Sequence, residues 1–367
     1  MSGGAYSPFT ARRSVLALLG LCGLGLASAQ TAQTSPAKTT RPIKPVKALK
    51  AVKTQPAAAP SEIPFEPLLA TESVKAWLAK AAATGVPESF AIPLLQTSMM
   101  QPVVKRYMDP PPPGSRKNWA AYKARFTDAY RIGLGQAFLR DHADTFDAAQ
   151  AKYGVSPAVI SAIIGVETLY GKISGHFKLI DVLPTLAFDY PRRAEFFQGE
   201  LLAFMQLVQA GTLSANTRGS FAGALGLPQF MPSSLQKWGA SASGGQTIDL
   251  SASPQDAIMS VASFLAGHGW VRGMPVAFEA PTIDENSAGA LLRSDASPAY
   301  DFVSIAPHAP KHAPKDIKYA VVDLQYLDLS HDYLLTTQNF HTLMQYNRSY
   351  FYASAVWYLA QKLGLPA

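Results

Sequence analysis

The sequence predicts a mainly α protein with a small β portion, an α+β fold. From about position 65, apolar residues recur at helical spacing along most of the chain. That spacing disappears over 270–337, where three strand-like runs, 274–280, 319–325 and 333–337, lie between polar turns. With 367 residues, 48% of them hydrophobic, the chain can bury the core of one large domain.

Several segments combine apolar periodicity with the end signals of helices. The clearest begins with Ser156, a capping residue, and Pro157, which suits a first turn; Gly171 suits the position after its last turn. A proline run at 109–119 breaks the helical pattern, and 218–232 is a glycine-punctuated loop. The predicted helical segments are 71–85, 88–100, 127–154, 156–171, 189–211, 253–269 and 339–364.

The net charge of +7 comes from the start of the chain. Residues 1–60 hold eight basic side chains and no acidic one, which leaves 24 basic against 25 acidic residues from position 61 onward. The part that can fold is therefore nearly neutral, and a nucleic-acid-binding surface is not predicted.

Residues 1–29 have the three parts of a secretory signal peptide: a basic start, an apolar run over 15–26 and a small-residue cleavage pattern that ends at Ala29. The apolar run is too short for a comfortable membrane span. Cys22 follows Leu21, where a lipid-attachment site needs a small residue, so we expect cleavage after Ala29 rather than lipid anchoring. The product is then periplasmic, soluble and free of cysteine, exported by either the general or the twin-arginine route.

Residues 30–60 are rich in Pro, Ala, Lys and Thr, a composition that cannot bury a core. We expect them to form a disordered linker whose lysines are able to lie against an acidic surface. The globular part, residues 61–367, is then the functional domain.

Glu167 stands out in the apolar segment "AIIGVETLYGK" (162–172). It follows three isoleucines at spacings of seven, four and three residues, so it shares their helix face and points to the core or a cleft. Burial and the negative end of the helix dipole both raise the pKa of a carboxylic acid, and an acid protonated near neutral pH can act as a general acid. The alternative is a structural glutamate neutralised by Arg192, by Arg193 or by backbone donors.

Three other segments carry polar and aromatic side chains that suit a neutral, hydroxyl-rich ligand such as a sugar chain. The loop 218–232 offers a hydroxyl, an amide and glycines for close approach, and 118–122 and 345–356 add tyrosines and an asparagine. Each segment alone is a weak signal, because aromatic side chains at helical spacing usually belong to a core. The candidates are Trp119, Tyr122, Ser220, Gly223, Gly226, Gln229, Phe230, Tyr346, Asn347, Tyr350 and Tyr352.

Four segments, "GVETLYG", "DYPRRAEFF", "GSFAGALGLPQFMPSS" and "YNRSYFYASAV", resemble the characteristic segments of the lytic murein transglycosylase B family. They occur in the family's order and at its approximate spacing, and the similarity runs from about residue 65 to the C-terminus. The resemblance implies a lysozyme-like catalytic core with an additional α-helical region and a small β portion. It also implies cleavage of the β-1,4 bond between N-acetylmuramic acid and N-acetylglucosamine in peptidoglycan, with a 1,6-anhydromuramyl product.

The resemblance also implies residue roles. Glu167 matches the family's single catalytic acid/base, which protonates the leaving oxygen and then deprotonates the muramyl 6-hydroxyl, while the muramyl N-acetyl group supports the developing cation. Tyr122 matches a wall tyrosine of the glycan groove, and Arg192 and Arg193 lie where an acidic stem peptide would be met. The other implied groove residues are Ser220, Gln229, Phe230, Tyr346, Asn347 and Tyr352.

The sequence departs from the family pattern in two places. Related enzymes can carry an EF-hand-like calcium loop after the segment "QFMPSS", but the stretch 239–253 has serines, glycines and Asp249 there. Because calcium needs several oxygen ligands, we predict no calcium, and no other metal or cofactor is indicated. Leu227 and Pro228 stand where an aromatic and a small residue of the groove wall are expected.

Two other functions stay open at the level of sequence. In the first, the enzyme hydrolyses the same bond, and Asp181 or Asp189 activates a water molecule. In the second, the chain is a non-catalytic wall-binding protein that retains the groove. The expected partner is a peptidoglycan glycan strand, with cell-wall synthesis proteins as further candidates, and we expect a monomer.

Overall fold

The computed structural model describes residues 63–366, apart from 111, 113, 246 and 294. The predicted signal peptide (1–29) and linker (30–60) lie outside the described residues. Within the described part, no helix is both long enough and apolar enough to cross a membrane. Helices dominate, so the predicted mainly α fold with a small β portion is confirmed.

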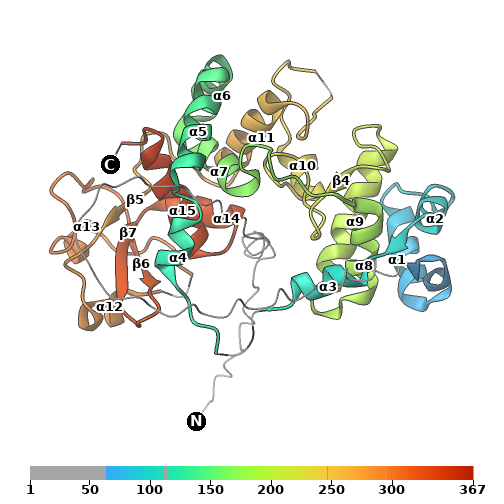
Figure 1. The fold of residues 1–367 in the computed structure, drawn as a ribbon, viewed down its shortest axis with the longest axis horizontal. Coiled ribbons are helices and arrows are strands. Elements are labelled where there is room, and N and C mark those ends of the chain that lie inside the picture. Colours follow the sequence, from blue (N-terminus) through green and yellow to red (C-terminus); the bar gives the residue numbers. More distant parts are fainter. Residues whose placement is uncertain (1–62, 111, 113, 246, 294, 367) are drawn as a thin grey trace, which may run out of the picture.

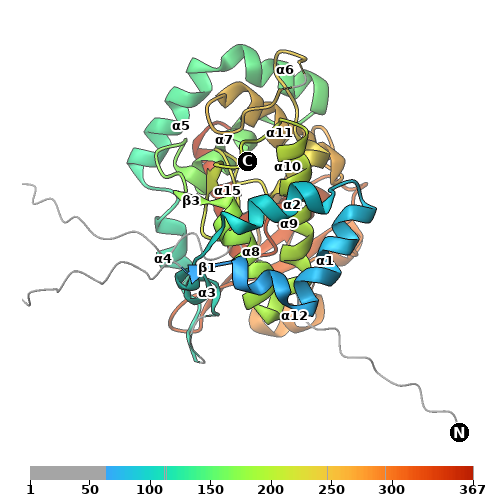
Figure 2. The same ribbon diagram turned by 90° about the vertical axis from the view of Figure 1, so that its right-hand side faces the viewer.

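The lobe on the right of Figure 1 is helical. At its centre, α8 and α9 pack against each other. Figure 2 shows the outer helices of the same lobe facing the viewer. A two-stranded pair, β1 (Ile63–Pro64) with β2 (Met99–Met100), ties its first residues down. Its helices are α1 (Glu72–Ala83), α2 (Glu88–Gln96), α3 (Pro102–Met108), α8 (Leu179–Asp189), α9 (Ala194–Gln209) and α10 (Pro232–Trp238), with short 3-10 turns at Glu66–Ala70 and Pro191–Arg193.

The sequence did not predict α8, which contains Pro184 in its interior. Proline has no N–H to donate to the carbonyl four residues earlier, that of Ile180. The hydroxyl of Ser98 donates to this carbonyl instead, over 2.6 Å. A contact between distant segments therefore supplies the hydrogen bond that the local sequence lacks.

Four helices join the two lobes along the top of Figure 1. Among them, α7 is central: it packs against α5, α11 and the C-terminal helix, and nine of its twelve residues are buried. The two-stranded pair β3 (Phe177–Lys178) with β4 (Arg218–Gly219) follows it toward the right-hand lobe. The four helices are α5 (Ala129–Asp141), α6 (Ala143–Tyr153), α7 (Pro157–Thr168) and α11 (Pro254–Gly267).

The left-hand lobe contains the antiparallel sheet that the strand-like runs predicted. Its strands β5 (Ala277–Glu279), β7 (His331–Thr336) and β6 (Ala320–Gln325) lie in that order. Alternate residues face opposite sides, so Val322 and Leu334 pack into the main core while Val321 and Leu335 pack into a second, smaller one. The remaining helices are α4 (Trp119–Ala124), α12 (Glu285–Leu291), α13 (Phe302–Ile305), α14 (Gln338–Tyr346) and α15 (Tyr350–Lys362).

Several predicted helical segments are shorter or more divided than expected. The segment 88–100 leaves the helix after Gln96, because its last residues pair as strand β2. The segments 127–154 and 339–364 each form two helices, which are separated at His142 and around Asn347. Strand pairing ends the first of these helices and a turn divides each of the other two, so periodicity alone did not place these ends.

Candidate active site

Glu167 lies in the last turn of α7, one residue before the helix ends at Thr168. Gly171 was predicted to follow the last turn, but the helix ends earlier, because three successive residues have positive φ: Leu169 (51°), Tyr170 (57°) and Gly171 (82°). Only glycine adopts this conformation without strain, so the surrounding structure must hold the other two. At the other end, Ser156 occupies the predicted cap position, although its side chain makes no capping hydrogen bond.

Three contacts hold this helix end. The hydroxyl of Thr168 donates to the backbone carbonyl of Leu227, over 2.9 Å, in the loop that departs from the family pattern. Tyr170 packs over Gly165 so closely that an added Cβ would lie 2.4 Å from the phenol oxygen. Arg131 donates to the carbonyl of Gly165. A side chain of α5 and a backbone carbonyl of the glycine loop therefore help to fix the turn that follows Glu167.

The carboxyl group of Glu167 accepts a hydrogen bond from the phenol of Tyr352, with 2.6 Å between Oε1 and the phenol oxygen. Burial raises the pKa of Glu167 to about 8, and the hydrogen bond from Tyr352 opposes part of this rise. Among the described residues, no ion pair forms with Glu167, so Arg192 and Arg193 do not neutralise it. The predicted upward shift of its pKa is confirmed, and Glu167 is largely protonated at neutral pH.

Two further tyrosines lie around this acid. The rings of Tyr346 and Tyr352 stack 6.3 Å apart with 10° between their planes. Tyr346 donates to the carbonyl of Pro228 over 2.5 Å, so Pro228, like Leu227, acts through its backbone. Burial, followed by the charge of Glu167, raises the pKa of Tyr122, Tyr346 and Tyr352. All three phenols therefore keep their protons and can donate hydrogen bonds.

Ser220 and Gln229 form side-chain hydrogen bonds to the backbone of their own loop, the glycine loop 218–232. The hydroxyl oxygen of Ser220 accepts from the backbone N–H of Ala224 (3.1 Å), and Ser220 is 3% exposed. The amide of Gln229 donates to the carbonyl of Gly226 (3.0 Å), and its backbone has a positive φ of 51°. An added Cβ at Gly226 would lie 2.5 Å from Leu250, so this position requires glycine. The loop is held in one rigid conformation beside the end of α7.

A cleft of about 220 Å³ adjoins this loop. Four of the predicted residues line it: Arg193, Gln229, Phe230 and Tyr346. Arg192 is exposed on the same turn and does not line the cleft. Sequence reasoning missed further lining residues, whose spacing carries no motif: Phe196, Glu200, Met231, Ser233, Ser234, Phe264, Gln345 and Arg348.

Asn347 lies between α14 and α15, in the turn that also carries the site tyrosines. It is 1% exposed, yet within the described structure neither its amide nitrogen nor its carbonyl oxygen has a hydrogen-bond partner. Leaving such a group unsatisfied in the interior costs about 1–3 kcal/mol. An amide held at this cost is suited to hydrogen bonds with a ligand.

Tyr122 reaches the site from α4. Its ring stacks on the buried Trp119 (6.2 Å, 25°) and contacts Phe351 (5.4 Å), so the two residues predicted from the segment 118–122 act together. Trp119 supports Tyr122 from the core side rather than lining the site, because it is fully buried.

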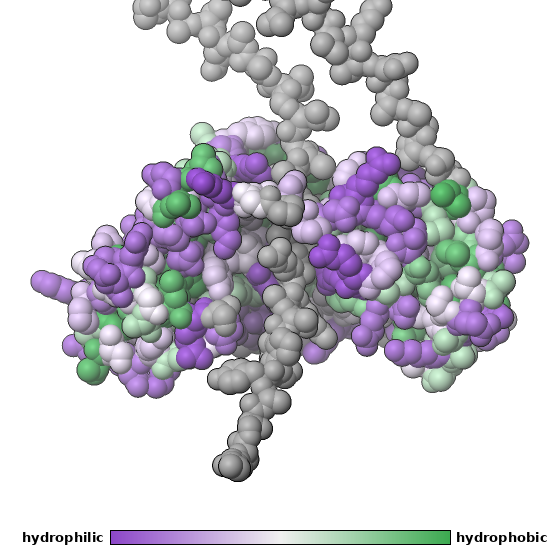
Figure 3. Space-filling model, turned by 90° about the horizontal axis from the view of Figure 1, so that it is seen from below, coloured by the Kyte–Doolittle hydropathy of each residue, from purple (hydrophilic) through white to green (hydrophobic). Residues whose placement is uncertain are grey.

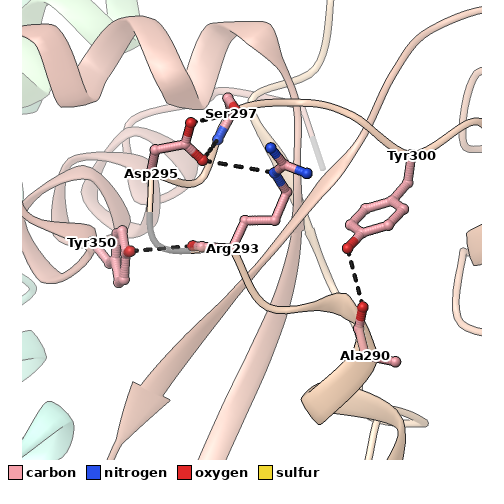
Figure 4. A network of polar contacts seen from close by, with 6 residues as sticks. All are labelled: Ala290, Arg293, Asp295, Ser297, Tyr300 and Tyr350. Carbon is pink, nitrogen blue, oxygen red and sulfur yellow. Dashed lines mark hydrogen bonds and ion pairs between the residues drawn. The ribbon is translucent and has the colours of Figure 1, made fainter. Parts of the chain in front are cut away.

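Tyr350 has a different role from its neighbours. Its phenol is directed at the backbone carbonyl of Arg293, at 3.5 Å, as Figure 4 shows. Figure 4 also shows that Asp295 pairs with Arg293 and accepts a hydrogen bond from Ser297. Tyr350 therefore connects the start of α15 to the loop that follows α12.

The stretch 239–253 is held by carboxylates that bond to its own backbone. Asp256, in the first turn of α11, accepts from the N–H groups of Ala242 (2.8 Å) and Asp249 (3.0 Å). Asp249 in turn accepts from Ser251 and Ala252. The described residues contain no group of three or more His, Cys, Asp or Glu side chains that could hold a metal ion. The absence of calcium stays a prediction, and these bonds give the loop another means of support.

Residues 70–361 match the family described as Transglycosylase SLT domain. The chain belongs to this family. Membrane-bound lytic murein transglycosylase B of Escherichia coli is 36% identical to this lytic transglycosylase over 258 residues, which cover 70% of each chain. The family that the four sequence segments indicated is therefore confirmed.

Solved structures agree with the fold of this lytic transglycosylase. Soluble lytic transglycosylase SltB1 from Pseudomonas aeruginosa has a TM-score of 0.72 and 32% identity, over 78% of this chain and 97% of that one. The Escherichia coli lytic transglycosylase SLT35 in complex with bulgecin A has a TM-score of 0.72 and 32% identity, over 82% and 95%. SltB3 from Pseudomonas aeruginosa in complex with NAG-NAM-pentapeptide has a TM-score of 0.69 and 27% identity, over 79% and 78%.

Proposed function

We propose that this lytic transglycosylase cleaves the β-1,4 bond between N-acetylmuramic acid and N-acetylglucosamine in peptidoglycan, with Glu167 as its single acid and base. The observation that carries the proposal is the state of Glu167: a carboxyl group with a pKa of about 8, bonded to one phenol and partly open to the site. Such a group is protonated when substrate arrives, and its conjugate base is strong enough to take a proton back.

The reaction proceeds in two steps. Glu167 first donates its proton to the glycosidic oxygen as the bond between that oxygen and the muramyl C1 breaks, and the muramyl N-acetyl group supports the developing cation. The Glu167 carboxylate then takes the proton of the muramyl 6-hydroxyl as its oxygen bonds to C1. The product has a 1,6-anhydro ring, no water is consumed, and Glu167 ends in its starting state.

The positions of the other carboxylates support a single-acid mechanism over hydrolysis with two. Asp181 accepts from the backbone N–H of Met99 (2.9 Å), and Asp189 pairs with Lys105 (2.5 Å). Both lie on α8, where they bond to β2 and α3 of the right-hand lobe rather than to Glu167. Among the described residues, no other carboxylate is a cause of the raised pKa of Glu167.

The surroundings of Glu167 support a glycan as ligand. Tyr122 offers aromatic surface and a phenol donor, Tyr346 lines the cleft with its ring, and the buried amide of Asn347 has unused hydrogen-bonding capacity. The side chains of Ser220 and Gln229 are already bonded within their loop. We therefore assign them to holding the loop in shape, so that its backbone positions the glycan strand. Many of the side chains that the two lobes present on the face shown in Figure 3 are hydrophilic, which suits a long polar polymer. The remaining assigned groove residues are Arg192, Arg193, Phe230 and Tyr352.

The setting of the reaction follows from the start of the chain. We propose that residues 1–29 direct export, that residues 30–60 act as a linker, and that the enzyme works in the periplasm as a soluble monomer. The cell wall is the site of its substrate, and proteins that build the wall are candidate partners.

Product analysis tests the reaction directly. Purified sacculi should yield muropeptides with an anhydro end, which weigh 18 mass units (about one water) less than the hydrolysis product and lack a reducing end. Reducing ends in stoichiometric yield would instead assign the enzyme as a muramidase. The Glu167→Gln variant is the negative control for both products, the anhydro end and the reducing end.

A further inference from the structure

A second pocket, of about 260 Å³, lies where α4 and α15 meet the sheet. Lys123 of α4 and Tyr358 of α15 line one side of it, while Glu279, His331 and Asp332 come from the sheet. Lys123 follows directly after Tyr122, so one short helix serves both sites. None of these five residues belongs to the motifs that indicated the family.

Two carboxylates face this pocket from the same side of the sheet. Glu279 pairs with Leu334 across β5 and β7, and Asp332 lies two residues before Leu334, so all three side chains share one face. The phenol of Tyr358 donates to Glu279 (2.9 Å), and that of Tyr326 donates to Asp332 (2.5 Å). A carboxylate can accept about four hydrogen bonds, so both retain capacity for a ligand.

Lys123 supplies a positive charge to this pocket but forms no ion pair with Glu279 or Asp332 in the described structure. Its ammonium nitrogen lies 3.5 Å from the centre of the Tyr358 ring. Burial lowers the pKa of Lys123, and the two carboxylates oppose that shift. The pocket thus presents separated charges of both signs, with one negative charge in excess when His331 is neutral.

The aromatic residues of this pocket do not favour a neutral sugar. Sugar rings stack on open aromatic faces, but the face of Tyr358 is covered by Lys123, and its ring also packs on Trp119 (5.7 Å). Tyr333 is stacked on His331, with 5.9 Å between the rings. The ligand that fits is therefore one with charges of both signs, each able to meet its opposite.

We propose that this pocket binds a zwitterionic amino-acid group of the peptidoglycan stem peptide, with its ammonium between Glu279 and Asp332 and its carboxylate on Lys123. The free end of a diamino-dicarboxylate residue has this chemistry, with an ammonium and a carboxylate on one carbon. The inference rests on the proposed function, because a stem peptide branches from the muramyl unit of the strand that the enzyme is proposed to cleave. It gives the sheet a role in substrate selection.

Calorimetry with the full chain and a glycan-free peptide tests the proposal. The probe is the tripeptide alanyl-γ-glutamyl-diaminopimelate, compared with the same peptide ending in lysine, which keeps the ammonium and lacks the carboxylate. The wild type should bind the first peptide at least about tenfold more tightly. Lys123→Met should remove this preference, and Asp332→Asn should weaken both peptides by a similar factor.

The matched control is Lys75→Met, which removes an exposed lysine of α1 paired with Glu72 and should change neither affinity. Melting temperatures check that each variant is folded, and the comparison of the two peptides on the wild type needs no variant. Equal affinity for the two peptides, or a preference that survives Lys123→Met, would overturn the assignment. Because neither peptide contains a glycosidic bond, these outcomes are independent of whether Glu167 performs the cleavage.

Discussion

Glu167 is half-buried and Glu200 is buried, and their carboxyl groups lie at opposite kinds of helix end. Glu167 lies at the C-terminal end of α7, where the helix dipole disfavours a negative charge. Glu200, on α9, reaches the N-terminal end of α10, where it accepts from the backbone N–H (3.0 Å) and the hydroxyl (2.7 Å) of Ser233. Burial raises the pKa of both groups, and for Glu200 the bonds from Ser233 oppose the rise.

The difference shows how one side chain serves chemistry in one place and structure in another. Two donors and the positive end of a helix commit Glu200 to joining α9 with α10. Glu167 has one phenol donor and a helix end of the wrong sign for an anion, so its proton is easily given and taken back. The comparison yields four predictions, in order of decreasing effect.

The largest effect should follow from Glu167→Gln. The amide keeps the shape of the acid but cannot transfer a proton, so glycan cleavage should fall by about 10²–10⁴-fold. The variant should remain folded and should still bind glycan strands. Turnover of purified sacculi, measured as released muropeptide, provides the assay. A variant that retains more than about a tenth of the activity would contradict the single-acid mechanism.

Glu200→Gln should mainly affect stability. The amide keeps one acceptor for the two donors of Ser233 and loses the charge at the start of α10, which should cost about 1–3 kcal/mol. Thermal unfolding should then begin a few degrees lower, while most of the cleavage activity persists below the transition. Loss of activity in a variant of unchanged melting temperature would place Glu200 in the chemistry instead.

The pH dependence of stability should distinguish Glu167 from an ordinary surface acid. Its pKa is about 8 in the folded protein against 4.5 for the unperturbed group, so the folded state holds the proton more tightly between these values. This contribution is complete below pH 4.5 and is lost as the pH rises through about 8. Glu167→Gln cannot titrate, so its melting temperature relative to the wild type should increase over that range. A constant difference would show that the carboxyl group is not perturbed.

The smallest expected effect concerns metal removal. Asp256 resembles Glu200 in that its carboxylate bonds to backbone N–H groups, here those of Ala242 and Asp249. Because the loop 239–253 has this support, EDTA should leave the melting temperature of the protein unchanged. A fall of several degrees, reversed by added calcium, would mean that the loop holds an ion after all.

Sequence reasoning located Glu167 because an acid among apolar residues at helical spacing is rare, and the four motif segments gave the family. It could not find α8, whose Pro184 argues against a helix until Ser98 is seen to bond Ile180. It also missed Glu200, since nothing local in "GELL" shows that α10 begins beside it. Contacts between residues far apart in the chain decide both cases.

By itself, the sequence determined the mainly α fold, the small sheet, the near-neutral domain and the acid on the core face of its helix. Periodicity and charge are local properties, so they can be read without coordinates. Only the tertiary structure decided which partner Glu167 has, because Tyr352 lies 185 residues away in the chain. It also decided that Lys123 lines a pocket with Glu279 and Asp332. A pKa depends on burial and on nearby donors and charges, and these exist only once distant segments pack together.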